Sequence, residues 1–189
     1  MSIKDELKAI TNRYADDFNV ICERSREERL KTLQPGAPVP AQGKLYGDAA
    51  RDEFKKKADA YRIQAMSIIG NELRALNEKM TAAPSTDAVN TIQLLKMRSN
   101  ITPEDINVLM MRYGDNSQVR DTLVDIAGQH DIKDYKFESN PIRVKAEKLK
   151  DLNISINNNL RLERAERGYA SAGFISFLNA SIDDALPDE

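Results

Sequence analysis

The beginning of the chain carries a narrow apolar stripe at helical spacing. Apolar residues recur every three or four positions, while charged residues fill most other positions up to residue 33. The stripe consists of Ile3, Leu7, Ile10, Tyr14, Phe18 and Ile21. This spacing is close to the heptad seam of a coiled coil, so it predicts one long helix over residues 3–33.

A second stripe of the same kind follows a break in the helical pattern. Residues 34–47 are rich in proline and glycine, which disfavour both helix and central strand, so they predict an extended connector. Residues 48–82 then carry apolar side chains at spacings of mostly three and four: Phe54, Ala58, Tyr61, Ala65, Ile68, Leu73, Leu76 and Met80. Two long helices joined in this way predict an antiparallel helical hairpin over residues 1–83.

The middle of the chain, residues 84–132, predicts a compact module of three short helices. Ser85 and Thr102 stand where N-caps are expected, Pro103 occupies a first helical position, and Gly114 is a natural C-cap. The predicted helices cover residues 86–99, 103–113 and 117–128. Each has an apolar face, so the module is able to bury a small core of its own.

Residues 133–189 predict a linker, a long helix and an apolar C-terminal segment. The linker covers residues 133–140, and Pro141 opens the helix. The three asparagines at 157–159 have poor helix propensity and predict a weak point in it. The last residues, 183–189, form an acidic tail.

The chain as a whole predicts an all-α fold, because no strand-like alternation persists for more than a few residues. We expect an elongated protein made of a long antiparallel helical hairpin, a small three-helix module and a long C-terminal helix. A seam of two residues per heptad buries little area in an isolated helix pair, so we also expect homo-oligomers. The self-association residues would be Leu7, Ile10, Tyr14, Phe18, Tyr61 and Ile68.

Composition argues against several classes of function. The chain has 28 basic and 30 acidic residues, so no overall basic excess attracts nucleic acid. Its glycines never form a nucleotide-binding loop. Cys22 and His130 are the single cysteine and the single histidine, and they lack the paired spacing of a zinc site. A Cys22–His130 catalytic pair is conceivable, but nothing in the sequence brings the two together. We therefore expect no catalytic residue, no cofactor and no metal, and a protein that is not an enzyme.

Residues 103–128 superficially resemble a helix-turn-helix, because two short helices flank a Gly-Asp-Asn turn. The surrounding segment 84–139 has six basic and nine acidic side chains. A DNA-binding module needs a positive surface, so we do not expect nucleic-acid binding here.

The apolar segment near the C-terminus is the most informative candidate site. Aromatic and aliphatic side chains are concentrated there, beside the acidic tail. Two interpretations remain open: the segment packs on its own chain, or it anchors a partner protein. The candidate partner-binding residues are Phe174, Phe177, Leu178 and Ile182.

Three stretches of the chain resemble a known group of phage proteins. They are residues 83–98 (APSTDAVNTIQLLKMR), residues 101–106 (ITPEDI) and residues 119–132 (VRDTLVDIAGQHDI). These stretches resemble small helical proteins encoded among the head-morphogenesis genes of tailed phages of Gram-positive bacteria. The charged N-terminal helices are similar in character to phage scaffolding-type proteins. The resemblance implies virion assembly or an accessory structural role, and it carries no catalytic residues.

We therefore expect a non-enzymatic phage structural or assembly protein that self-associates and binds a coat-type virion protein. The alternative is a phage-encoded inhibitor that binds a host defence protein or a small signalling ligand. Such an inhibitor needs a pocket with convergent cations, for which Arg161, Arg164 and Arg167 are candidates. The chain starts without a signal-peptide pattern, and its longest weakly polar stretch, 169–178, is shorter than the ~20 residues of a membrane span. We expect no membrane association, and a location in the host cytoplasm or the virion.

Overall fold

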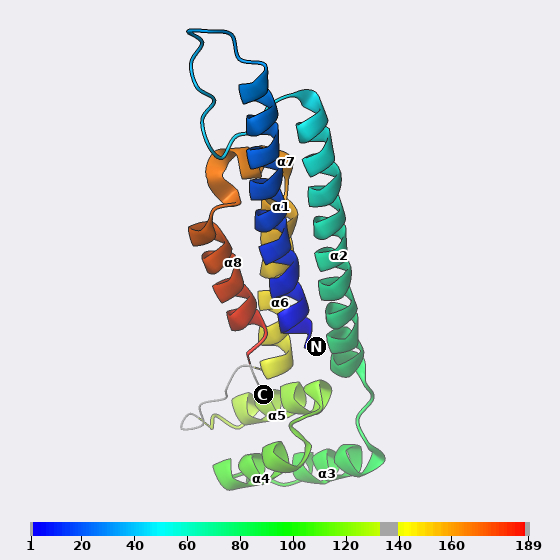
Figure 1. The fold of residues 1–189 in the computed structure, drawn as a ribbon. Coiled ribbons are helices and arrows are strands. Elements are labelled where there is room, and N and C mark those ends of the chain that lie inside the picture. Colours follow the sequence, from blue (N-terminus) through cyan, green and yellow to red (C-terminus); the bar gives the residue numbers. More distant parts are fainter. Residues whose placement is uncertain (1, 133–139, 188–189) are drawn as a thin grey trace. The chain divides into compact units, whose positions relative to one another are not determined.

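The all-α prediction is confirmed by a computed structural model of the chain, which describes residues 2–132 and 140–187. The described residues are mostly helical and contain no β-strand. The elements are α1 (Ile3–Lys31), α2 (Asp48–Thr81), α3 (Thr86–Lys96), α4 (Pro103–Tyr113), α5 (Ser117–Gln129), α6 (Pro141–Asn159), α7 (Leu162–Arg164), the π-helical turn η1 (Ala165–Tyr169) and α8 (Ala172–Ala185) (Figure 1). The predicted linker lies, apart from residue 140, outside the described residues.

The chain divides into two compact units. Residues 1–71 together with 148–189 form unit 1, and residues 72–147 form unit 2. This grouping differs from the division into 1–83, 84–132 and 133–189 that the sequence suggests. The reason is that the C-terminal helices share one core with α1 and the first part of α2, which sequence order does not reveal.

The start of α1 is set by a capping box. The Ser2 hydroxyl accepts a hydrogen bond from the Asp5 backbone N–H (3.1 Å), and the Asp5 carboxylate accepts one from the Ser2 backbone N–H (3.2 Å). These two bonds satisfy amide groups that no helical carbonyl can reach. They begin the helix at the first residue of the apolar stripe.

Helices α1 and α2 contact each other in antiparallel order. Phe18 of α1 packs edge-on against Phe54 of α2, with ring centroids 5.0 Å apart. About one turn further along α2, Lys57 donates to the carboxylate of Asp17, the residue before Phe18 in α1 (3.0 Å). Residues 32–47 connect the two helices, as the proline-rich sequence predicts, and all three glycines there have positive φ.

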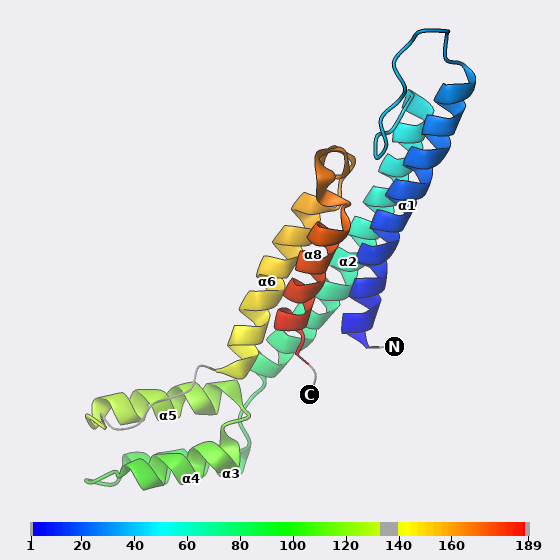
Figure 2. The same cartoon turned by 60° about the vertical axis from the view of Figure 1, so that its left-hand side comes forward.

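The core of unit 1 is built from one face of each of its four long helices, which lie side by side (Figures 1 and 2). Each large apolar side chain that is fully buried contributes about 1.5–3 kcal/mol. The buried side chains include Leu7, Ile10, Tyr14, Phe18 and Ile21 of α1, Phe54, Ala58, Ala65 and Ile69 of α2, Leu149, Leu152, Ile156 and Leu160 at α6, and Ile175, Leu178 and Ile182 of α8.

The C-terminal helix is shorter than the sequence suggests. α6 ends at Asn159, within the asparagine run that predicts a weak point, and the chain then turns through α7 and η1 into α8. The Tyr14 hydroxyl donates to the carbonyl of Arg161 (2.9 Å) and lies 3.2 Å from that of Asn159, so the break has a buried polar partner. Gly168 has a φ of 93°, a conformation that side-chain-bearing residues rarely adopt. The reversal ends with Ser171 as the N-cap of α8.

Unit 2 contains the three short helices that the sequence predicts. Ser85 and Thr102 cap α3 and α4 as expected, and Gly114 ends α4. A Cβ atom at Gly114 would lie 2.2 Å from the Met110 carbonyl oxygen, so this close approach requires glycine. The helices enclose a core of their own, made of Ala88, Ile92, Leu95, Ile101, Ile106, Leu109, Val119, Leu123, Ile126 and Ala127.

Candidate functional site

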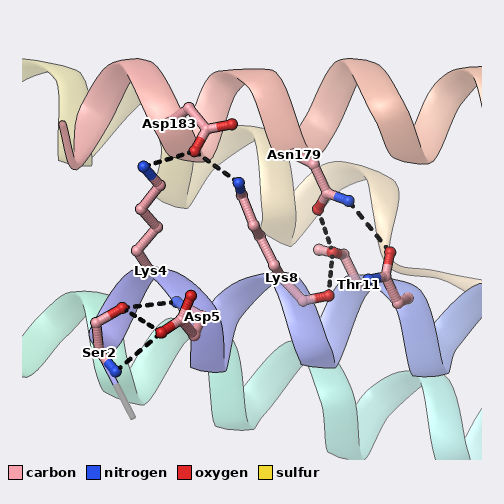
Figure 3. A network of polar contacts seen from close by, with 8 residues as sticks. Ser2, Lys4, Asp5, Lys8, Thr11, Asn179 and Asp183 are labelled. Atoms are coloured by element: carbon pink, nitrogen blue, oxygen red, sulfur yellow. Dashed lines mark hydrogen bonds and ion pairs between the residues drawn. The ribbon is translucent and has the colours of Figure 1, made fainter. Parts of the chain in front are cut away.

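Helix α8 is attached to α1 by a line of polar contacts. Asp183 accepts from Lys4 (2.9 Å) and Lys8 (2.6 Å), as Figure 3 shows. One turn further along, the buried Thr11 hydroxyl donates to Asn179 Oδ1 (2.7 Å), and the Asn179 amide donates to Asn12 (3.1 Å). Hydrogen bonds from the two lysines lower the pKa of Asp183 below its ordinary value. Asp183 and Asp184 thus belong to α8 rather than to a free acidic tail.

The four predicted partner-binding residues fall into two groups. Leu178 and Ile182 are 0% exposed and lie in the core of unit 1. Phe174 is half-buried, and Phe177 is 64% exposed. The two interpretations of this segment therefore describe different faces of one helix. One face docks on the same chain, and the other leaves an aromatic ring in solvent.

The exposed ring of Phe177 ends a row of aromatic side chains. The Arg164 guanidinium lies 5.0 Å from the Tyr169 ring centroid. Tyr169 packs on Phe174 with centroids 4.6 Å apart, and Phe174 lies 6.2 Å from Phe177. Contacts of this kind hold rings in fixed positions and contribute about 0.5–1.5 kcal/mol each. The contact with Phe174 therefore holds the exposed Phe177 ring in position.

A groove between α6 and α8 lies directly beside Phe177. Its volume is about 450 Å³. Lys148 of α6 donates to the Asp184 carboxylate of α8 (2.7 Å), and this ion pair is part of the groove wall. The remaining lining residues are Asp151, Leu152, Ser155, Phe177, Ala180, Ser181 and Ala185. The combination of an exposed aromatic ring and a groove with small side chains suits an apolar side chain from another protein.

The predicted self-association residues are used mainly within the chain. Leu7, Ile10, Tyr14 and Phe18 are between 0 and 5% exposed, and Tyr61 and Ile68 are partly buried. A second copy could contact the four buried side chains only if helices were exchanged between chains.

Tyr61 of α2 forms a hydrogen bond across the contact between α1 and α2. Its hydroxyl donates to Asp17 (2.6 Å), which also accepts from Lys57 (3.0 Å). Burial alone would raise the pKa of Asp17, but the hydrogen bonds from Tyr61 and Lys57 outweigh this effect and lower it. Burial, together with the bond to the Asp17 carboxylate, raises the pKa of Tyr61 to about 12. This cluster stabilises the α1–α2 contact as a neutral tyrosine beside an ion pair.

The single cysteine is poorly suited to nucleophilic chemistry. Cys22 is buried, and burial raises its thiol pKa to about 11, which disfavours the thiolate. Cys22 belongs to unit 1 and His130 to unit 2. No group of three or more His, Cys, Asp or Glu side chains that could hold a metal occurs among the described residues. Within those same ranges, no helix is both long and apolar enough to cross a membrane.

The three arginines considered for a ligand pocket have separate contacts. Arg161 Nε donates to the carbonyl of Asn157 (2.7 Å), while Arg164 contacts the hydroxyl and ring of Tyr169. Arg167 is exposed. Glu166, which lies beside Arg167 in the sequence, accepts from Arg51 of α2 (3.0 Å). None of the three arginines is among the residues that line the grooves described here.

A second apolar surface lies on unit 2 and was not foreseen from the sequence. Four side chains of α3 and α4 or their ends are more than 60% exposed: Leu94, Met97, Val108 and Met111. Two of them are next to residues that the core uses, Leu94 beside Leu95 and Val108 beside Leu109. Adjacent apolar residues on a short amphipathic helix cannot both face its core. Such adjacent pairs were therefore the sequence signal for exposed apolar side chains on this unit.

Comparisons with protein-family models, with curated proteins and with solved structures found no match for this chain.

Proposed function

We propose that the chain is a non-enzymatic structural or assembly protein of a tailed phage that binds a coat-type protein through the outer face of α8. The observation that carries this proposal is Phe177, a large aromatic side chain that is 64% exposed and held at the edge of the α6–α8 groove. Aromatic side chains that fill a pocket on a partner often dominate the binding energy of an interface.

The docking of α8 supports a binding role because it makes the surface rigid. Leu178 and Ile182 fix the inner face, and the Asp183–lysine pairs fix the end of the helix. Binding of a partner at Phe177 then restricts little further side-chain or backbone freedom in this chain, which favours affinity. Self-association through the α1 stripe is not part of this proposal, because those side chains are buried within the chain.

The test is to measure binding of the full chain to the coat protein encoded by the same phage genome. Isothermal calorimetry should detect a complex, and Phe177→Ser should weaken it by about tenfold or more. Ile63→Ser is the matched control, since Ile63 is also 64% exposed in unit 1 but lies on α2 away from the groove. We expect the control to bind as the wild type does. No complex, or equal loss in both variants, would contradict the proposal.

A further inference from the structure

We propose that the groove between α3 and α4 binds a basic amphipathic helix of a partner protein. This surface belongs to unit 2, so the inference does not depend on the function proposed for α8.

The groove has an apolar floor and charged ends. Its volume is about 310 Å³, and it is lined by Leu94 and Leu95 from α3 and by Val108 and Leu109 from α4, with Thr91, Arg98, Glu104 and Asp105. An ion pair joins Arg98 to Asp105 (2.8 Å) at one end. About one turn beyond the lining at the other end, Arg112 pairs with Asp87 (3.2 Å), which also accepts from the Tyr113 hydroxyl.

The groove is formed before any partner arrives. Both α3 and α4 pack against α5, whose residues complete the core beneath them (Figure 2). The Thr102–Asp105 capping box fixes the start of α4, with bonds of 3.0 and 3.2 Å. A preformed groove loses little conformational entropy on binding.

The exposed side chains indicate a helix as the occupant. Leu94 and Val108 are 64% and 62% exposed, and Met97 and Met111 are each 82% exposed. Clustered exposed apolar side chains on one module mark interaction surfaces, and methionines adapt their shape to a partner's side chains. The lining from Thr91 of α3 to Arg98, just beyond the end of that helix, extends for roughly 10 Å at ~1.5 Å per residue. This length matches about two turns of a helix that presents apolar residues at i, i+3 or i+4, and i+7.

The charge of the module determines which kind of helix fits. Described residues 84–132 carry four basic and seven acidic side chains, a net charge of −3. At the groove itself, the charge of Arg98 is matched by Asp105, and Glu104 adds a further carboxylate. A helix with Lys or Arg beside its apolar stripe is attracted to this surface. A second copy of the module brings the same negative charge and is disfavoured.

The test uses designed peptides of about 18 residues, with leucines at i, i+3, i+4 and i+7. One peptide has lysine at the other positions, the second has glutamate there, and the third is a scrambled form of the lysine peptide. Fluorescence anisotropy with the full chain should show binding of the lysine peptide. The glutamate and scrambled peptides should bind about tenfold more weakly or worse.

Two variants and one control locate the site. Leu94→Ser and Val108→Ser change exposed side chains, so the fold should be kept, which circular dichroism checks. Each should weaken binding of the lysine peptide about tenfold. Val20→Ser is the matched control, because Val20 is 63% exposed but lies on α1 in unit 1. Equal binding of the lysine and glutamate peptides, or unchanged binding by Val108→Ser, would overturn the proposal. So would a wild-type dimer that Val108→Ser abolishes, since the occupant would then be a second copy.

Discussion

At the scale of single residues, the turn before α8 depends on one glycine. Gly168 has a φ of 93°, and replacing it by alanine imposes a strained backbone there. We expect Gly168→Ala to lower the free energy of unfolding by roughly 1–2 kcal/mol, as measured by urea denaturation.

The control for this prediction is the same substitution at Gly70. Gly70 lies within α2, and a Cβ atom there has no neighbour within 4 Å. Alanine has the better helix propensity, so Gly70→Ala should raise stability by about 0.5–1 kcal/mol. A change of the same sign in both variants would mean that the backbone argument is wrong.

The burial of neighbouring residues on α8 shows what the sequence could and could not predict. Ile175, Leu178 and Ile182 are spaced i, i+3 and i+7, and this is the face that docks. Phe174 and Phe177 are spaced i and i+3 on the adjacent face, so the segment is apolar on more than one side. Periodicity identifies a helix in such a segment but cannot select its inner face, because the choice depends on packing partners far away in sequence.

At the scale of elements, the attachment of α8 to α1 depends on the charge of Asp183. Hydrogen bonds from Lys8 and Lys4 lower the Asp183 pKa below 3.8 in the folded chain. The unfolded state therefore binds this proton first as the pH falls. The stabilisation is fully present well above pH 3.8 and is lost as the pH falls through the lowered folded pKa.

We expect Asp183→Asn to be less stable than the wild type at neutral pH, because the ion pairs of Lys4 and Lys8 with the Asp183 carboxylate are lost. The difference in unfolding free energy should shrink toward zero once the pH is below the folded pKa. Asp184→Asn on the same helix is the control, since Asp184 pairs with Lys148 of α6 rather than with α1 and is more exposed. Urea titrations across pH measure both. A stability difference that does not change with pH would contradict the ion-pair explanation.

The organisation of the elements was predicted in part. The capping residues correctly predicted where α3 and α4 begin, because Ser85, Thr102 and Pro103 act within one helical turn. At the end of α6, the asparagine run predicted a weak point but not the break itself. The hydrogen bond that stabilises the break comes from Tyr14, about 145 residues earlier in the chain. Local signals such as caps can be read from the sequence, whereas contacts across the chain cannot.

At the scale of the whole molecule, the stripe on α1 raises the question of how many chains assemble. A narrow heptad-like stripe predicts oligomers when its only partner is another helix. Here α1 contacts α2, α8 and the end of α6 within one chain, and its four central stripe residues are at most 5% exposed. The area that would drive association is already buried, so we expect a monomer at micromolar concentration.

Size-exclusion chromatography with light scattering at two concentrations checks this prediction. Both runs should give a mass near 21.3 kDa, the mass of one chain. A mass that rises toward twice this value would contradict it, and Val108→Ser would then separate two causes. Loss of the dimer in that variant would place the interface at the α3–α4 groove, where Val108 is 62% exposed. A dimer that persists would instead favour exchange of long helices between chains, because the buried stripes of α1 and α2 both have a heptad-like pattern.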